Sequence, residues 1–115
     1  MVSKLHFPNV FPCPVYGLMY NIFLTHQAEK DARKLEQAGL KPKAASLLWI
    51  LRRNPFQNPP PYEKLQGCDD TYSRRITIQH RLIYQVLPNE NGERDVSGIP
   101  YQGIVKIVRM WTHYE

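Results

Sequence analysis

The chain has 115 residues, enough for one domain with a single modest core. Its formal net charge is +5 and its pI about 9.4, which favours a polyanionic partner such as nucleic acid, or an acidic protein. Cys13 and Cys68 lie far apart and the four histidines are scattered, so neither a metal site, a cofactor nor a disulfide framework is indicated. No apolar run reaches the roughly 18 residues of a membrane span, and no signal peptide is apparent, so a cytoplasmic location is expected.

Residues 1–18 form an N-terminal extension interrupted by three prolines, which exclude a regular helix and a central strand: Pro8, Pro12 and Pro14. This extension is either a loose arm or a segment that packs on the domain through its apolar side chains. The domain itself is expected over residues 19–115, and it begins with the strand-like run MYNIFLT.

Two helices are predicted next. Thr25 is a suitable N-cap for the first, Ala28, Ala32 and Leu35 form its apolar stripe, and Gly39 ends it. The second helix has Pro42 in its first turn and ends at Asn54-Pro55, and its stripe consists of Ala44, Leu47, Leu48 and Leu51. An antiparallel pair of helices packed on a sheet is therefore expected.

Basic side chains are spread over the outer side of this helix pair: Lys30, Arg33, Lys34, Lys41, Lys43, Arg52 and Arg53. They are consistent with an ordinary solvated helical face. The alternative is electrostatic docking on ribosomal RNA, in which each neutralised phosphate adds to the salt dependence of binding.

Two strands are predicted over residues 73–78 and 80–87, separated by little more than Gln79. Because successive side chains alternate between faces, the apolar set of the second strand faces the core and Arg81 lies on the outer face. The same alternation puts Arg74 and Arg75 on opposite faces. Ahead of these strands, four prolines within residues 55–61 restrict the loop that carries Glu63.

The segment of residues 88–103 contains Asn91-Gly92, a strong turn signal, and is read as a hairpin insertion. It could contact a partner, although an idle surface insertion is equally consistent with the sequence, since loops tolerate added length. The last strand, GIVKIVRMW, follows, and regular alternation would place Arg109 and His113 on one face.

Three side chains have the chemical types that metal-independent RNA cleavage needs. When the RNA 2′-OH attacks the adjacent phosphorus, a base removes the proton, a cation stabilises the phosphorane, and an acid protonates the leaving 5′-oxygen. Glu63, Arg81 and His113 match these roles in order. Their convergence depends on the fold, because nothing in their spacing requires it.

Three runs of the sequence, NPFQNPPPYEKLQG, YSRRITIQHRLIYQV and VKIVRMWTHYE, resemble the YoeB/Txe toxins of the RelE superfamily. The resemblance implies an α+β fold with an antiparallel twisted sheet packed against an N-terminal two-helix hairpin. It also implies a type II toxin that acts as a ribosome-dependent, metal-independent messenger-RNA endonuclease and inhibits translation.

The same resemblance assigns roles to individual residues. Glu63 is expected to be the general base, Arg81 the group that stabilises the phosphate, His113 the general acid, and Tyr114 a residue that positions the substrate. Further RNA contacts are expected from Arg74, Arg75, Lys64 and Arg109, with Arg75 favoured over its neighbour. The chain continues one residue beyond the His-Tyr pair, to Glu115.

The expected partners are a YefM/Axe-like acidic antitoxin, the ribosome and messenger RNA, with no membrane. A homodimer and a toxin–antitoxin heterotrimer or heterotetramer are all left open. Two rival functions fit the same scaffold. One is a ParE-like inhibitor of DNA gyrase, and the other is a basic RNA- or protein-binding module without catalysis.

Overall fold

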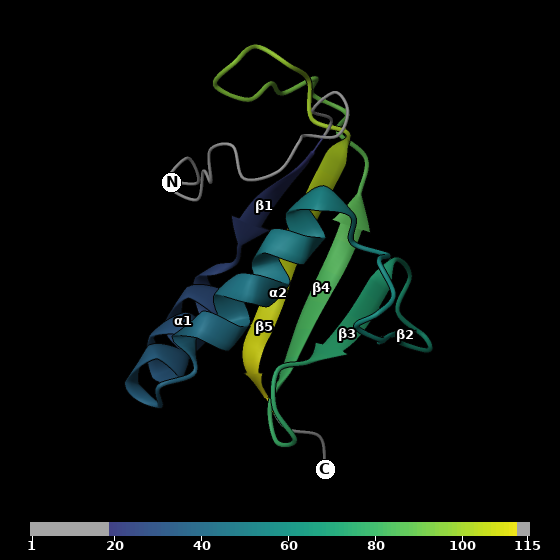
Figure 1. The fold of residues 1–115 in the computed structure, drawn as a ribbon. Coiled ribbons are helices and arrows are strands. Elements are labelled where there is room, and N and C mark those ends of the chain that lie inside the picture. The colour runs from purple at the N-terminus through teal and green to yellow at the C-terminus, as the bar shows by residue number, and fades with distance from the viewer. Residues whose placement is uncertain (1–18, 113–115) are drawn as a thin grey trace.

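A computed structural model describes residues 19–112. The elements, in chain order, are β1 (Tyr20–Leu24), α1 (His26–Gln37), α2 (Lys41–Arg53), β2 (Tyr62–Lys64), β3 (Thr71–Arg75), β4 (Arg81–Leu87) and β5 (Gly103–Thr112). The two helices pack on one face of a five-stranded sheet (Figure 1). The α+β fold with a two-helix layer is thereby confirmed. None of the helices within residues 19–112 is long and apolar enough to cross a membrane.

The strand order is β1-β5-β4-β3-β2. The pairs β2–β3, β3–β4 and β4–β5 are antiparallel, whereas β1 and β5 are parallel. The sheet is therefore antiparallel apart from this edge, where one parallel pair makes it mixed. The reason is the connection, because the chain leaves β1 through two helices and β5 returns beside β1 in the same direction.

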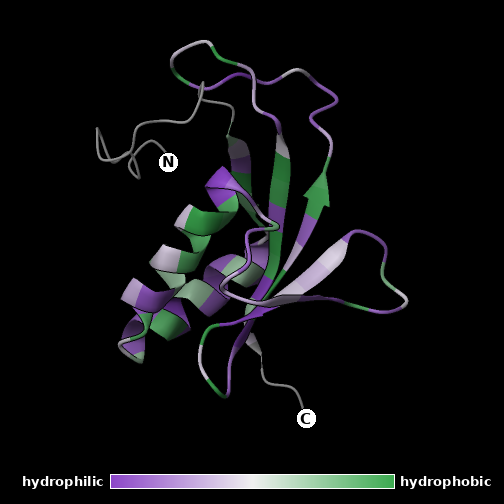
Figure 2. Cartoon of the chain, turned by 45° about the vertical axis from the view of Figure 1, so that its right-hand side comes forward, coloured by the Kyte–Doolittle hydropathy of each residue, from purple (hydrophilic) through white to green (hydrophobic). Residues whose placement is uncertain are grey.

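The core lies between the helices and the sheet. α1 contributes Ala28 and Leu35, and α2 contributes Ala44, Leu47 and Leu51, as their spacing predicts. Facing them are buried residues of the sheet that include Leu82, Tyr84, Val105 and Ile107. Figure 2 shows the hydrophobic colour concentrated in β4, β5 and parts of both helices, while the connecting loops are largely hydrophilic.

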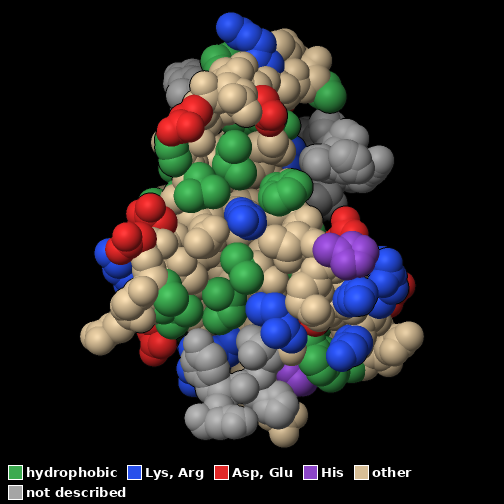
Figure 3. Space-filling model, turned by 180° about the vertical axis from the view of Figure 1, so that it is seen from behind, with side chains coloured by type: hydrophobic (Ala, Val, Ile, Leu, Met, Phe, Trp, Pro, Cys, Tyr) green, Lys and Arg blue, Asp and Glu red, His purple; other side chains and the backbone are tan. Residues whose placement is uncertain are grey.

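The helices leave the other face of the sheet uncovered. On this face apolar side chains lie beside isolated basic ones (Figure 3). Phe23 of β1 is 53% exposed, in contrast to the neighbouring Ile22 and Leu24, which pack against the core.

The ends of α1 follow from two residues. The Thr25 side chain accepts a hydrogen bond from the backbone N–H of Ala28 at 3.1 Å, which confirms it as the N-cap. Gly39, just after the C-cap, has φ +75°, a left-handed conformation that glycine adopts without a Cβ clash. The Leu40 N–H then donates to the Leu35 carbonyl at 2.8 Å, and the chain turns back into α2.

The predicted strand over residues 73–78 is wrong beyond Arg75. A turn replaces its second half, in which the Thr77 hydroxyl accepts from the N–H groups of Gln79 and His80, each at 3.1 Å. The Ile76 N–H donates to the His80 carbonyl at 2.8 Å and closes the turn. Ile78 is consequently 87% exposed rather than part of a strand face.

Residues 88–102 connect β4 to β5 at the end of the sheet opposite the β3–β4 turn (Figure 1). The Asn89 amide organises this loop, because it donates to the carbonyls of Glu93 and Tyr101 and accepts from the Glu93 N–H. An isolated antiparallel bridge joins Arg94 and Pro100. The loop thus has the reversed path of a hairpin, and its status as an insertion remains a prediction.

Candidate functional site

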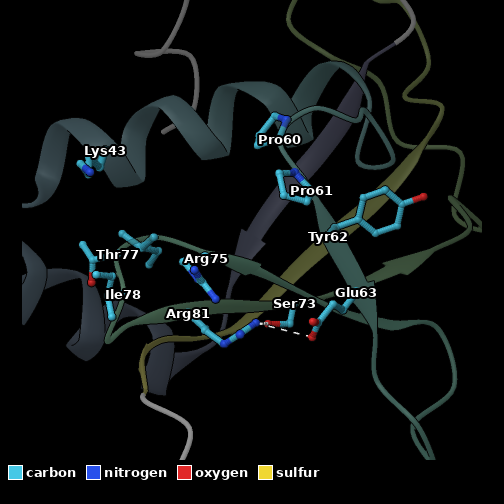
Figure 4. A pocket seen from close by; sticks show the side chains of 11 residues that line it. Lys43, Pro60, Pro61, Tyr62, Glu63, Ser73, Arg75, Thr77, Ile78 and Arg81 are labelled. Carbon is cyan, nitrogen blue, oxygen red and sulfur yellow. Dashed lines mark hydrogen bonds and ion pairs between the residues drawn. The ribbon is translucent and has the colours of Figure 1, made fainter.

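An open cleft of about 500 Å³ lies where α2, the proline segment (residues 55–61), β2 and the β3–β4 turn meet. Its walls bring together three of the predicted site residues, Glu63, Arg75 and Arg81 (Figure 4). The remaining lining residues are Lys43, Pro60, Pro61, Tyr62, Ser73, Ile76, Thr77 and Ile78. The residues expected to supply a base and a phosphate-stabilising cation therefore share one cleft.

Glu63 is the central residue of β2, a three-residue edge strand, and not of a loop as the sequence suggested. Its strand partner in β3 is Ser73. A carboxylate oxygen, Oε1, lies 3.6 Å from Nη1 of Arg81. The Glu63 side chain is 65% exposed, so the carboxylate is accessible from the cleft.

Arg81 is the first residue of β4, and its side chain is only 18% exposed. Its Nη1 also donates to the hydroxyl of Ser73 at 3.2 Å, and Ser73 itself is 1% exposed. The preceding His80 stacks on Trp111 of β5, with ring centroids 4.0 Å apart, which ties the start of β4 to the end of β5. The Arg81 side chain is therefore held by the buried Ser73, and the strand start that carries it is anchored by the stacked His80.

Ser73 was given no role in the sequence analysis. Its only signal is alternation, because it shares a face with Arg75 in the same strand. Its position between Glu63 on one neighbouring strand and Arg81 at the start of the other could not be inferred without the register.

Arg75 is exposed and lies directly opposite Arg81 in the register of β3 and β4. Two like charges in this relationship destabilise a sheet. Glu63 compensates Arg81, and a bound anion would compensate the pair further. The cleft therefore has the electrostatic character of an anion site.

Arg74, expected to contact RNA, is 1% exposed and points away from the cleft. Its guanidinium donates to three backbone carbonyls of the proline segment, those of Pro60 at 2.6 Å and of Pro55 and Gln57 at 2.9 Å. This geometry does not support a direct contact with RNA phosphate, because the guanidinium is buried and both of its terminal nitrogens donate to the backbone. The opposite faces of Arg74 and Arg75 agree with the predicted alternation.

Tyr84 assists Arg74 in fixing the proline segment. The Tyr84 hydroxyl donates to the Pro55 carbonyl at 2.8 Å, and the Arg74 guanidinium lies 5.0 Å from the ring centroid of Tyr62. Burial raises the pKa of Tyr84 to about 12 against the opposing effect of the Arg74 charge, so its hydroxyl remains a donor. Arg74 and Tyr84 thus set the path of the chain that enters β2 and carries Glu63.

Arg109, another expected RNA contact, pairs with Asp31 of α1 instead. Its Nε lies 2.8 Å from Oδ2 of Asp31, whose carboxylate is fully buried and also accepts from the Met110 N–H at 2.9 Å. Burial raises the pKa of Asp31, but the hydrogen bonds from Arg109, Met110 and Gln27 outweigh it, and the pKa lies below its usual value. This pair docks α1 on β5 and lies outside the lining of the cleft.

Lys64 is exposed on β2 but does not line the cleft. His113 and Tyr114 lie outside the described residues. Thr112, which precedes them, is the β5 partner of Arg81. Within residues 19–112 no three His, Cys, Asp or Glu side chains are grouped to hold a metal ion.

Neither a known family profile nor a curated protein sequence matches this chain. Solved structures do match it. A YoeB/ParE toxin from Agrobacterium tumefaciens is 23% identical, with a TM-score of 0.65 over 82% of this chain and 99% of the toxin. The YoeB dimer from Staphylococcus aureus is 29% identical, with a TM-score of 0.62 over 83% of this chain and 98% of that one. The YoeB–YefM complex from Staphylococcus aureus gives 28% identity and a TM-score of 0.58, over 83% and 98%.

The fold of this chain is that of the toxins in these solved structures. Within this class the likeness is to the YoeB toxins, which confirms the resemblance predicted from the sequence.

Proposed function

We propose that this protein is the toxin of a type II toxin–antitoxin pair and that it cleaves messenger RNA on the ribosome. The observation that carries the proposal is the cleft in which Glu63 lies 3.6 Å from Arg81, with Arg75 on the same wall. Together these residues provide a carboxylate and two cations beside an opening large enough for part of an RNA strand.

In the proposed reaction the Glu63 carboxylate removes the proton of a ribose 2′-OH, whose oxygen attacks the adjacent phosphorus. Arg81 stabilises the negative charge that develops on the pentavalent phosphorane. The bond from phosphorus to the 5′-oxygen breaks, and that oxygen takes a proton from a general acid. The products are a 2′,3′-cyclic phosphate and a free 5′-hydroxyl, and no step requires a metal ion.

His113 is the proposed general acid and Tyr114 the proposed substrate-positioning residue. The support is the pairing of Thr112 with Arg81, since the chain continues to His113 directly after this contact. General acid–base catalysis contributes about 10² to 10⁴-fold per group. We therefore expect His113→Gln to slow cleavage by that order.

The proposed protein partner is an acidic antitoxin of the YefM/Axe type. YoeB from Staphylococcus aureus has been solved in complex with YefM and as a dimer. A net charge of +5 favours an acidic segment that neutralises the cleft, and such a segment could order itself on binding. The protein would act in the cytoplasm, where messenger and ribosomes are.

The test is to incubate the purified protein with translating ribosomes and to map the messenger ends, comparing wild type with Glu63→Gln, Arg81→Ala and His113→Gln. New ends within the ribosome-bound codon, absent or much reduced in the three variants, are expected. Intact messenger with wild-type protein would contradict the proposal. Inhibition of DNA gyrase by the same preparation would favour the ParE-like alternative instead.

A further inference from the structure

Lys43 lies on the wall of the cleft that α2 contributes. It is the third residue of the helix, and it lines the same cleft as Glu63, Arg75 and Arg81. Figure 4 shows Lys43 and Glu63 at opposite sides of the cleft, with Arg75 and Arg81 between them. Lys43 and Glu63 therefore lie at opposite ends of the cleft.

Positive charge is in excess at the end of the cleft where Lys43 lies. Among the described lining residues Glu63 is the only acidic one, and it pairs with Arg81. Within residues 19–112 no carboxylate pairs with Lys43 or with Arg75. The end of the cleft away from Glu63 therefore carries positive charge without a compensating carboxylate from the described part of the chain.

We propose that Lys43 binds a second phosphate of the RNA strand, one that flanks the scissile phosphate held by Arg81. This inference rests on the proposed function. A single phosphate cannot contact both ends of the cleft, whereas an RNA strand presents a negative charge at every nucleotide. The strand would then run from Glu63 and Arg81, past Arg75 and the β3–β4 turn, toward α2.

The neighbouring Lys41 shows why Lys43 is singled out from the basic residues of the helix pair. Lys41 lies two positions earlier in the same first turn, is also exposed, and is paired with Glu36 at 3.8 Å. It does not line the cleft. The two lysines thus differ in position while sharing charge, helix and local backbone, and Lys41 is the matched control.

The test uses single-stranded oligonucleotides with 2′-O-methyl groups at every ribose, which remove the attacking hydroxyl and prevent cleavage. A dinucleotide has one internucleotide phosphate, and a tetranucleotide has three. Binding by the wild-type chain, Lys43→Gln and Lys41→Gln is measured from low to moderate salt. Because no ribosome is present, a contact of Lys43 with ribosomal RNA cannot contribute to the result.

For the tetranucleotide, Lys43→Gln is expected to weaken binding about two- to fivefold at low salt. The slope of log K against log salt should become shallower by about 0.7, the value for one phosphate contact on a single strand. For the dinucleotide, and for Lys41→Gln with either ligand, the slope should equal that of the wild type. Equal slopes for Lys43→Gln and Lys41→Gln on the tetranucleotide would overturn this inference alone. Failure of the wild-type chain to bind the tetranucleotide would also overturn this inference, whereas the proposed function fails only if ribosome-bound messenger stays intact.

Discussion

The carboxylate of Glu63 and the guanidinium of Arg81 lie 3.6 Å apart although they belong to strands that do not pair with each other. β3 separates them, and its Ser73 fills the position between them, as the strand partner of Glu63 and a hydrogen-bond partner of Arg81. This pair of a carboxylate and a guanidinium is preorganised, because the register of three strands sets its geometry and no flexible loop is involved.

Removal of the Ser73 hydroxyl is predicted to lower the rate of cleavage. Ser73→Ala deletes the hydrogen bond at 3.2 Å that orients Arg81, and a bond to a charged group contributes about 1.5 to 3 kcal/mol. We expect the single-turnover cleavage rate on programmed ribosomes to fall by roughly tenfold or more. Ser46→Ala, on an exposed position of α2, is the control and should cut at the wild-type rate.

Substitutions of the adjacent arginines Arg74 and Arg75 are predicted to affect different properties, the stability of the fold for Arg74 and RNA binding for Arg75. Arg74→Met leaves the carbonyls of Gln57 and Pro60 without this donor, at about 1 to 3 kcal/mol for each buried unsatisfied group, while the Pro55 carbonyl keeps the Tyr84 hydroxyl. Urea unfolding should therefore show a loss of several kcal/mol for Arg74→Met.

Arg75→Met removes an exposed charge, and we expect its stability to stay within about 0.5 kcal/mol of the wild type while RNA binding weakens. If the two variants were equally stable, the structural role assigned to Arg74 would be wrong.

Acid is predicted to destabilise the protein partly through Asp31. Its folded-state pKa is lowered by its hydrogen bonds, so the unfolded state binds more protons than the folded state in the window between the two pKa values. The stabilisation is fully present above the unfolded pKa of about 3.9 and is lost as the pH falls through the folded value. Asp31→Asn should be less stable at pH 7 and should show a weaker pH dependence in this acidic window. An unchanged profile would exclude Asp31 as a source of it.

The helices could be predicted because each signal is local. The stripe of Ala28 and Leu35, the cap at Thr25 and the left-handed Gly39 require no knowledge of distant residues. The strand over residues 73–78 was overextended because the apolar-polar alternation continues through Ile76 and Ile78. The Thr77 hydroxyl binds two backbone N–H groups there and stabilises a turn that alternation does not reveal.

The site was predicted in part. The residue types of Glu63 and Arg81 suggested a base and a cation, and the resemblance to the toxins implied that they lie together. The fates of Arg74 and Arg109 depend on contacts with residues far away in sequence, since Asp31 and Arg109 are 78 positions apart. The sequence did not distinguish Lys43 from the other basic residues of the helix pair, because only its place on the cleft sets it apart.

Single-turnover cleavage of ribosome-bound messenger by Glu63→Gln, Arg81→Ala and the double variant tests most directly whether the two residues act in one chemical step. Residues that act as a unit are strongly non-additive. We predict that each single variant cuts about 10² to 10⁴ times more slowly than the wild type, and that the double variant is scarcely slower than the worse single one. Wild-type rates in both single variants, or fully additive losses in the double variant, would contradict the shared catalytic site.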